Sequence, residues 1–180
     1  MSLTESLLLV LAILGSAGIA WGMTRWSMNK HAERNARVAV SDAALMEVAR
    51  RLGLTFGAGP AYEHPFIGPI AAFGAARGVL DGIAVHVGVD MGSEGDTART
   101  ELRAELPGGY DAALLPRYAL NCERYTLERG PKTLTLYPVV RKTGSSQFIV
   151  YELETEPATI IALLRELVEL ARTASERTRY

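Results

Sequence analysis

An uncharged and strongly apolar run near the N-terminus constrains this chain more than any other feature. It extends over seventeen residues from Leu7 to Met23, LLLVLAILGSAGIAWGM, and Leu3 and Thr24 can lengthen it. A helix rises about 1.5 Å per residue, so this run approaches the roughly 30 Å of hydrocarbon in a bilayer. A buried helix of a soluble domain would show a polar stripe, and none is visible here. We therefore expect a transmembrane helix over residues 7–24, after a short extracytoplasmic N-terminus over residues 1–6.

The charges on either side of the run distinguish a cleaved signal peptide from a retained anchor. Gly18-Ile19-Ala20 could serve as a small-residue cleavage site, but the preceding MSLTES carries no positive charge. Four cations follow the run instead, at Arg25, Lys30, Arg34 and Arg37. Because basic flanks tend to remain on the cytoplasmic side, the sequence predicts a single-pass signal-anchor in the cell membrane. The N-terminus would lie outside and the C-terminal domain in the cytoplasm.

Residues 25–40 form a basic juxtamembrane linker in this interpretation. If the helix continues past Trp26, the last three of the four cations share one face toward anionic lipid. A solvated linker that only sets the topology explains them equally well. Trp21 and Trp26 lie near the expected cytoplasmic boundary, where indole rings favour the headgroup region, so we interpret them as interfacial residues.

Small residues within the run suggest a surface for helix packing. Gly18 and Gly22 form a GxxxG pattern, and Gly15 with Ser16 extends it. Such a stripe lets another helix approach closely, through self-association or contact with other membrane-protein subunits. Small residues are common in membrane helices, so composition alone is the competing explanation.

The remaining 140 residues, 41–180, are long enough for one folded domain. From Val38 onward there are 15 Lys and Arg residues against 18 Asp and Glu residues, interspersed, which argues against a nucleic-acid partner. Arg outnumbers Lys sixteen to three, a usage typical of GC-rich bacterial genomes. Cys122 is the only cysteine, which excludes an intramolecular disulfide and a zinc site built from several cysteines.

Periodicity predicts an α+β domain. Ser41 or Asp42 can cap a first amphipathic helix, and Gly53 can end it. Gly and Pro residues break the chain from Gly57 to Pro69, which we interpret as a structured loop. Pro157 opens a terminal helix with a broad apolar stripe, expected to fray from Thr173.

Strands fill the region between the two helices. Asp81-Gly82 between apolar runs predicts a two-residue hairpin joining strands over 74–80 and 83–90. Residues 99–106 alternate charged and less polar side chains, as in a half-buried strand with a solvated charged face. Strands over 118–127 and 132–140 are expected to form another hairpin around Arg129-Gly130-Pro131, and a further strand is expected over 147–153. The order helix, strands, helix predicts an antiparallel sheet of about five to seven strands, packed on one face by two amphipathic helices.

No residue pattern indicates a catalytic, cofactor or metal site. His86 and Asp90 share one face of a strand and could orient each other or hold a metal with further ligands, but an ordinary polar-face histidine is the favoured interpretation. His64 lies beside Glu63 in the Gly and Pro loop, and one such pair is no signature. Cys122 beside Glu123 is interpreted as structural. The motifs of common hydrolases, kinases and nucleotide-binding proteins are absent.

These observations leave three hypotheses. The leading one is a non-enzymatic interaction, accessory or assembly module of a membrane complex, in contact with the bilayer. The second is a membrane-tethered small-molecule or lipid-binding domain, with a pocket between the sheet and the helices near Gly57 to Pro69. The third is an enzyme in which His64, His86 and carboxylates converge.

Overall fold

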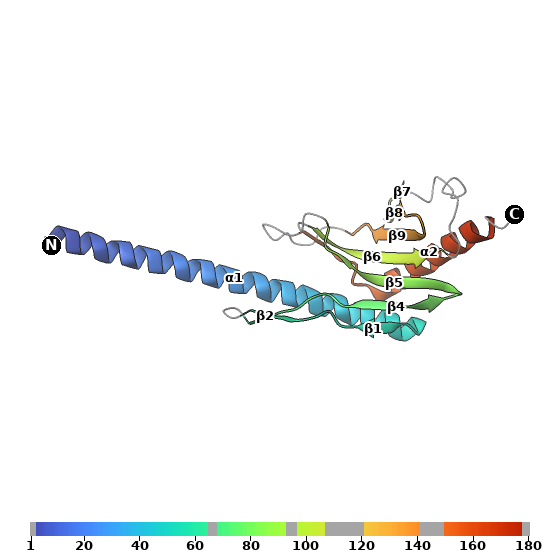
Figure 1. Cartoon of the computed structure of the whole chain (residues 1–180), viewed down its shortest axis with the longest axis horizontal. Coiled ribbons are helices and arrows are strands. Elements are labelled where there is room, and N and C mark those ends of the chain that lie inside the picture. The colour runs from blue at the N-terminus through green and yellow to red at the C-terminus, as the bar shows by residue number, and fades with distance from the viewer. Residues whose placement is uncertain (1–2, 65–67, 93–96, 107–120, 141–149, 178–180) are drawn as a thin grey trace.

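The structure is a computed structural model that describes residues 3–64, 68–92, 97–106, 121–140 and 150–177. Two helices flank a series of strands along the chain (Figure 1). The elements are α1 (Leu3–Leu52), β1 (Thr55–Gly57), β2 (Tyr62–His64), β3 (Gly68–Ile70), β4 (Ala75–Leu80), β5 (Ile83–Asp90), β6 (Thr97–Glu105), β7 (Asn121–Cys122), β8 (Tyr125–Arg129), β9 (Thr133–Pro138), β10 (Val150–Glu152) and α2 (Pro157–Arg177).

Helix α1 is continuous over 50 residues, and its N-terminal half projects away from the sheet (Figure 1). The expected helix start at Ser41 or Asp42 is therefore wrong. Both side chains face the domain instead of capping a helix: Ser41 is buried, and Asp42 Oδ1 accepts a hydrogen bond from the Gly74 N–H at 2.8 Å. No Gly or Pro interrupts residues 25–40, so nothing local ends the helix before the domain.

The end of α1 at Gly53 is confirmed. Gly53 has a φ of 68°, in the left-handed region that L side chains avoid. The Leu54 N–H then donates to the Ala49 carbonyl at 2.9 Å, which is the closing hydrogen bond of a Schellman motif. The chain turns from the helix directly into the first strand.

The main sheet is antiparallel along its whole path. Its strand order is β1-β4-β5-β6-β9-β8-β7, and β10 joins in parallel beside the first residues of β6. Within the described residues the path holds seven strands, at the upper end of the expected five to seven, and β10 makes eight. This parallel pairing was not expected, because nothing in the sequence of residues 147–153 indicates which strand β10 pairs with.

Two predicted hairpins are confirmed. Strands β4 and β5 pair around Asp81 and Gly82, whose φ values of 50° and 80° are those of a type I′ turn. Strands β8 and β9 pair around Gly130, whose N–H donates to the Thr133 carbonyl at 2.8 Å. Parts of the other expected strands, residues 118–120 and 147–149, lie outside the described residues.

The loop expected between Gly57 and Pro69 is partly wrong. Strand β1 pairs with β4, and β2 pairs with β3 in a separate two-stranded sheet. Two hydrogen bonds tie this small sheet to α1: Asn35 Nδ2 donates to the Pro69 carbonyl at 3.0 Å, and the Ala71 N–H donates to Asn35 Oδ1 at 2.9 Å. A long-range side chain thus supports strands too short to be stable alone.

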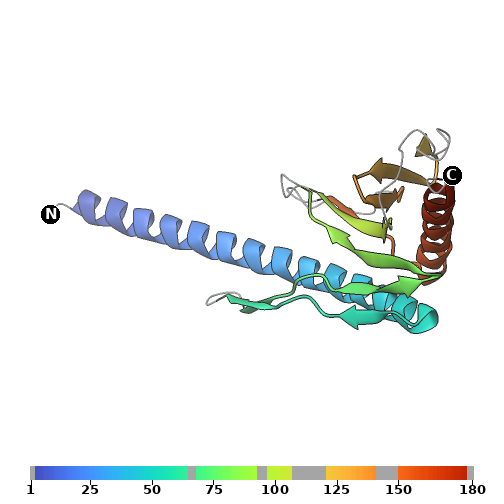
Figure 2. The ribbon, with the colours of Figure 1, turned by 45° about the vertical axis from the view of Figure 1, so that its right-hand side comes forward.

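Both helices cover the same face of the main sheet, as expected (Figure 2). The core combines the C-terminal part of α1, alternate residues of β5 and β6, and the apolar stripe of α2. Its largest fully buried side chains are Leu45, Leu102, Leu134, Leu136, Ile160, Leu163, Leu164 and Leu167. The expected fraying from Thr173 is wrong up to Arg177, because Ala174 is buried and holds the last turn on the core.

The side chains of α1 are described from Leu14 onward. Over the described residues, no helix combines the length and apolar character needed to cross a bilayer.

Candidate functional site

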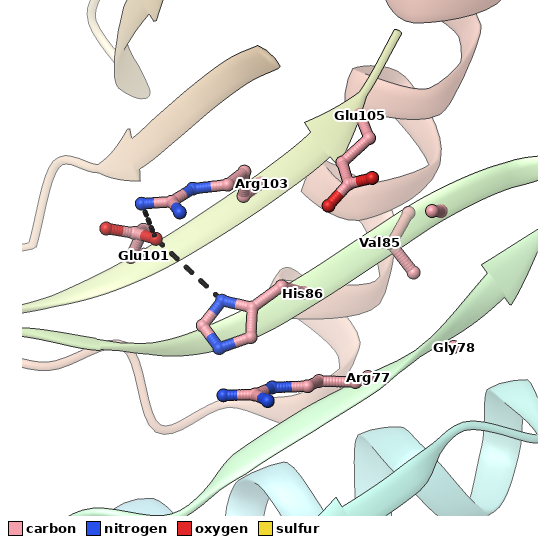
Figure 3. A pocket seen from close by; sticks show the side chains of 8 residues that line it. Arg77, Gly78, Val85, His86, Glu101, Arg103 and Glu105 are labelled. Carbon is pink, nitrogen blue, oxygen red and sulfur yellow. Dashed lines mark ion pairs between the residues drawn. The ribbon is translucent and has the colours of Figure 1, made fainter. Parts of the chain in front are cut away.

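The face of the sheet opposite the helices carries a row of basic side chains. In the register of the three central strands, Arg77 of β4 lies beside His86 of β5, and His86 lies beside Arg103 of β6. Side chains alternate across a strand, so all three point away from the helix-covered core. Figure 3 shows His86 between the two arginines.

Glu101 forms the acidic part of this cluster. Its Oε1 lies 2.8 Å from Arg103 Nη2 and 3.8 Å from His86 Nδ1 (Figure 3). At the first distance the two side chains form an ion pair, and the second distance is too long for a hydrogen bond. The Nδ1 atom is buried and has no hydrogen-bond partner among the described residues. The imidazole therefore sits close to a carboxylate without bonding to it.

Burial and neighbouring charges shift two titratable groups of the cluster. Burial raises the pKa of Glu101, a residue only 7% exposed, and Arg103 offsets part of that rise. Burial lowers the pKa of His86, and the charges of Arg77 and Arg103 lower it further. Burial and the two arginines therefore favour the neutral form of His86.

These side chains line an open hollow of about 460 Å³. The other residues that line it are Gly78, Ala84, Val85 and Glu105. Gly88 leaves room for the imidazole beside the hollow: a Cβ added there would lie 2.9 Å from His86 Cε1. Uncharged residues thus line part of the hollow, and two arginines, two glutamates and His86 provide its charged and titratable groups.

A second charged group on the same face is packed differently. Arg99 bonds to Asp90 at 3.1 Å, lies 3.6 Å from Glu128, and stacks over the Tyr137 ring at 3.5 Å from its centroid. Burial raises the pKa of Tyr137 to about 12, so its hydroxyl stays protonated. The alternative in which His86 and Asp90 orient each other is not formed, because Asp90 bonds to Arg99 of the neighbouring strand.

The solvated charged face expected for residues 99–106 is also partly wrong. Glu101 is buried, and Arg103 forms an ion pair with it. Alternation along one strand shows which residues share a face, but it does not show which charges the neighbouring strands bring to them.

The residues expected to meet a membrane lie on the projecting half of α1. Trp21 and Trp26 are exposed, and Arg25 lies over the Trp21 ring at 5.4 Å from its centroid. Lys30 lies 4.0 Å from Glu33. Arg34 and Arg37 follow on the same continuous helix at one-turn spacing, where Arg37 lines a hollow with Leu153 and Thr155 of the domain. A Cβ added at Gly15, Gly18 or Gly22 would meet nothing within 4 Å, so these positions are open for a neighbour.

The histidines and the cysteine do not form one described site. His64 lies in β2 of the small sheet, whereas His86 lies in β5 of the main sheet, and Cys122 lies in β7. The side chains of His64 and Cys122 are outside the described residues. In the part of the chain that is described, no three His, Cys, Asp or Glu side chains gather where they could hold a metal ion.

One part of the basic row could have been found from the sequence. A two-residue turn at Asp81-Gly82 fixes the register of its hairpin, and that register places Arg77 opposite His86. The position of Arg103 beside His86 could not be predicted in this way. The connection from β5 to β6 has no two-residue turn sequence that would fix the register of those strands.

Comparisons with protein-family models, curated protein sequences and solved structures found no match for this chain. Its function therefore has to be inferred from its own residues and their arrangement.

Proposed function

We propose that this chain is a single-pass, membrane-anchored bacterial protein that acts as a non-enzymatic interaction, accessory or assembly module. The N-terminal part of α1 lies in the cell membrane with its N-terminus outside, and the α+β domain lies in the cytoplasm. Its partners are the lipid bilayer and other membrane-protein subunits, or a second copy of the chain bound through α1.

The exposed apolar surface of the projecting helix carries this proposal. Leu14, Ile19, Trp21 and Met23 are each 63–68% exposed. At 3.6 residues per turn, their spacing places them around the helix instead of on one stripe. Apolar surface in water costs about 25 cal/mol for each Å². A helix that is apolar all round is stable in lipid or inside another protein, and the rest of the described chain does not cover it.

The anchoring can be tested with a matched pair of double variants. Leu14→Arg with Ile19→Arg places two charges in the proposed span, where each costs about 2.5–3.5 kcal/mol on insertion scales. Val79→Arg with Val139→Arg adds the same charges to exposed positions of the domain. We expect only the first pair to move the chain out of the carbonate-washed membrane fraction. If the unchanged chain is itself recovered without membranes, the anchor is excluded.

The orientation requires a separate measurement. In a Cys122→Ser background, Ser2→Cys and Lys132→Cys each provide one thiol for a membrane-impermeant maleimide. We expect labelling at position 2 in intact spheroplasts and at position 132 only after lysis. The reverse pattern would place the domain outside the cytoplasm.

The interaction role is tested by purification of the full chain from detergent-solubilised membranes. Gly18→Ile with Gly22→Ile closes the open surface of α1 without adding charge. We expect the unchanged chain to carry a stoichiometric protein partner or a second copy, and the variant to lose it. A monomer without protein partner in both cases would contradict the proposal.

A second candidate, lipid or small-molecule binding, is favoured by one hollow of about 290 Å³ where α1 enters the domain. It is lined by Glu33, Ala36, Arg37, Val40, Leu153 and Thr155, which offer an apolar wall beside two charges. The second hypothesis places its pocket between the sheet and the helices. Among the described residues, the packed core fills that space. Co-purified lipid that is lost in Val40→Asp would support this candidate over the first.

A further inference from the structure

The basic row on the open sheet face contains a cation that the described chain leaves unpaired. Arg77 makes no hydrogen bond or ion pair with any described residue, although Arg103 lies two strands away in the same row. In the neighbouring group on this face, by contrast, Arg99 has two carboxylates and an aromatic ring.

The two carboxylates of the hollow do not neutralise Arg77. Glu101 is buried and forms an ion pair with Arg103 at 2.8 Å. Glu105 lies at the far end of the hollow from Arg77 (Figure 3). Arg77 is therefore the cation without a described counter-charge at one end of the hollow, and Glu105 makes the other end negative.

The imidazole of His86 lies between Glu101 and Arg77. Its Nδ1 is turned toward Glu101, and its other ring nitrogen is turned toward Arg77 (Figure 3). Gly88 makes this placement possible, since a side chain there would collide with the ring. A glycine at the centre of a strand costs stability, which is consistent with a backbone position kept clear for the ring.

We propose that this hollow binds a small oxyanion, of the carboxylate or phosphate type, between Arg77 and Arg103, with His86 as the third contact. Guanidinium groups are the strongest protein partners of such anions, since they offer several N–H donors in one plane. Its volume, about 460 Å³, lies in the range of small-molecule sites. Glu105 at the negative end disfavours polyanions and suits a ligand whose other end is neutral or cationic.

Binding should be coupled to protonation of His86. A bound anion adds a negative charge beside the ring, so the ring takes up one proton from solvent and presents N–H groups to Glu101 and to the anion. The charged groups that face the ring are Arg77 from β4 and Glu101, Arg103 and Glu105 from β6. Anion affinity should therefore rise as the pH falls from about 7.5 to 6.

The test uses the full chain in a nonionic detergent and follows the histidine side chains by NMR. Sulfate serves as a tetrahedral oxyanion that does not titrate in this range, and acetate serves as the carboxylate. The His86 signal is the one that disappears in His86→Gln. We expect sulfate or acetate to shift it saturably with a midpoint on the order of 1 mM at pH 6, and more weakly at pH 7.5. The stronger of the two shows whether the ligand is phosphate-like or carboxylate-like.

Three variants separate a site from general attraction of anions. Arg77→Gln should weaken binding at least about tenfold, and Gly88→Ala should weaken it by displacing the ring. Arg124→Gln removes the same charge from an exposed arginine outside the hollow and should leave the midpoint unchanged. The proposal is overturned if neither anion gives a saturable shift up to about 100 mM, or if Arg124→Gln weakens binding as much as Arg77→Gln. These results do not depend on the membrane anchor.

Discussion

At the scale of single residues, the surroundings of His86 on the open sheet face favour its neutral form. His86 is half-buried, and the two arginines on the strands beside it oppose a third positive charge. Its pKa is lowered below the ordinary value of 6.5. The folded chain therefore binds a proton at His86 less readily than the unfolded chain does.

This shift predicts how stability depends on pH. A lowered pKa means that the unfolded state holds more protons, so the free energy of unfolding falls as the pH drops through about 6.5 toward the lowered pKa of the folded chain. We expect His86→Gln to lose less stability than the unchanged chain between pH 7.5 and 5.5. Urea unfolding at both values measures this, and the difference at pH 7.5 reports the substitution itself. Equal losses in the two chains would show that His86 titrates normally.

At the scale of elements, α1 combines two roles in one uninterrupted helix. From Val38 onward, its buried residues belong to the core of the domain, whereas the exposed apolar residues Leu14, Ile19 and Met23 lie on the projecting half. A continuous helix between the two parts transmits position rigidly, because no Gly or Pro lies between Met23 and Ser41. The domain is therefore oriented by the helix and not merely tethered by it.

Two adjacent residues of α1 test its place in the core. Leu45 is 1% exposed and Met46 is 49% exposed. Leu45→Ala should lower the free energy of unfolding by about 2–5 kcal/mol, because it leaves a cavity between α1 and the sheet. Met46→Ala should change it by less than about 1 kcal/mol. Similar losses for both variants, measured by urea unfolding, would mean that α1 does not pack as described.

The Asn35 side chain ties the small β2–β3 sheet to α1. It bonds to the backbone of Pro69 and Ala71. Asn35→Ala should speed amide hydrogen exchange over residues 62–64 and 68–71 while the core strands keep their protection. Asn29→Ala, at an exposed position of the same helix, is the matched control. Unchanged exchange in Asn35→Ala would show that the sheet holds itself.

At the scale of the whole molecule, the fold separates a packed domain from a projecting helix (Figures 1 and 2). The described core takes nothing from residues before Val38, whereas Asn35 contacts the small sheet. The two parts should therefore be separable by truncation.

Removal of residues 1–24 should leave the urea midpoint of the domain unchanged, since no described residue in that part of α1 is buried in the core. Removal of residues 1–37 should lower the midpoint, because it also deletes Asn35 and the turn of helix before Val38. Circular dichroism during urea titration measures both. A large loss in the shorter truncation would mean that the projecting half contributes to the domain.

The sequence by itself determined the features set by short-range geometry. Asp81-Gly82 determined the hairpin of β4 and β5 and, with it, the pairing of Arg77 and His86, because a type I′ turn has one register. Gly53 and Pro157 determined a helix end and a helix start, and the two apolar stripes predicted a sheet covered on one face.

Tertiary structure alone decided the features that depend on contacts between distant segments. Ser41 and Asp42 are residue types that often cap a helix, but here they lie inside α1 and contact the domain. Asp42 can accept the Gly74 N–H only because the folded chain brings Gly74 beside α1. The parallel pairing of β10 and the meeting of Arg103 with His86 follow from connections whose sequences set no register. The positive end of the hollow therefore arises from the folded sheet, because charges spread over three strands become neighbours only when those strands pair.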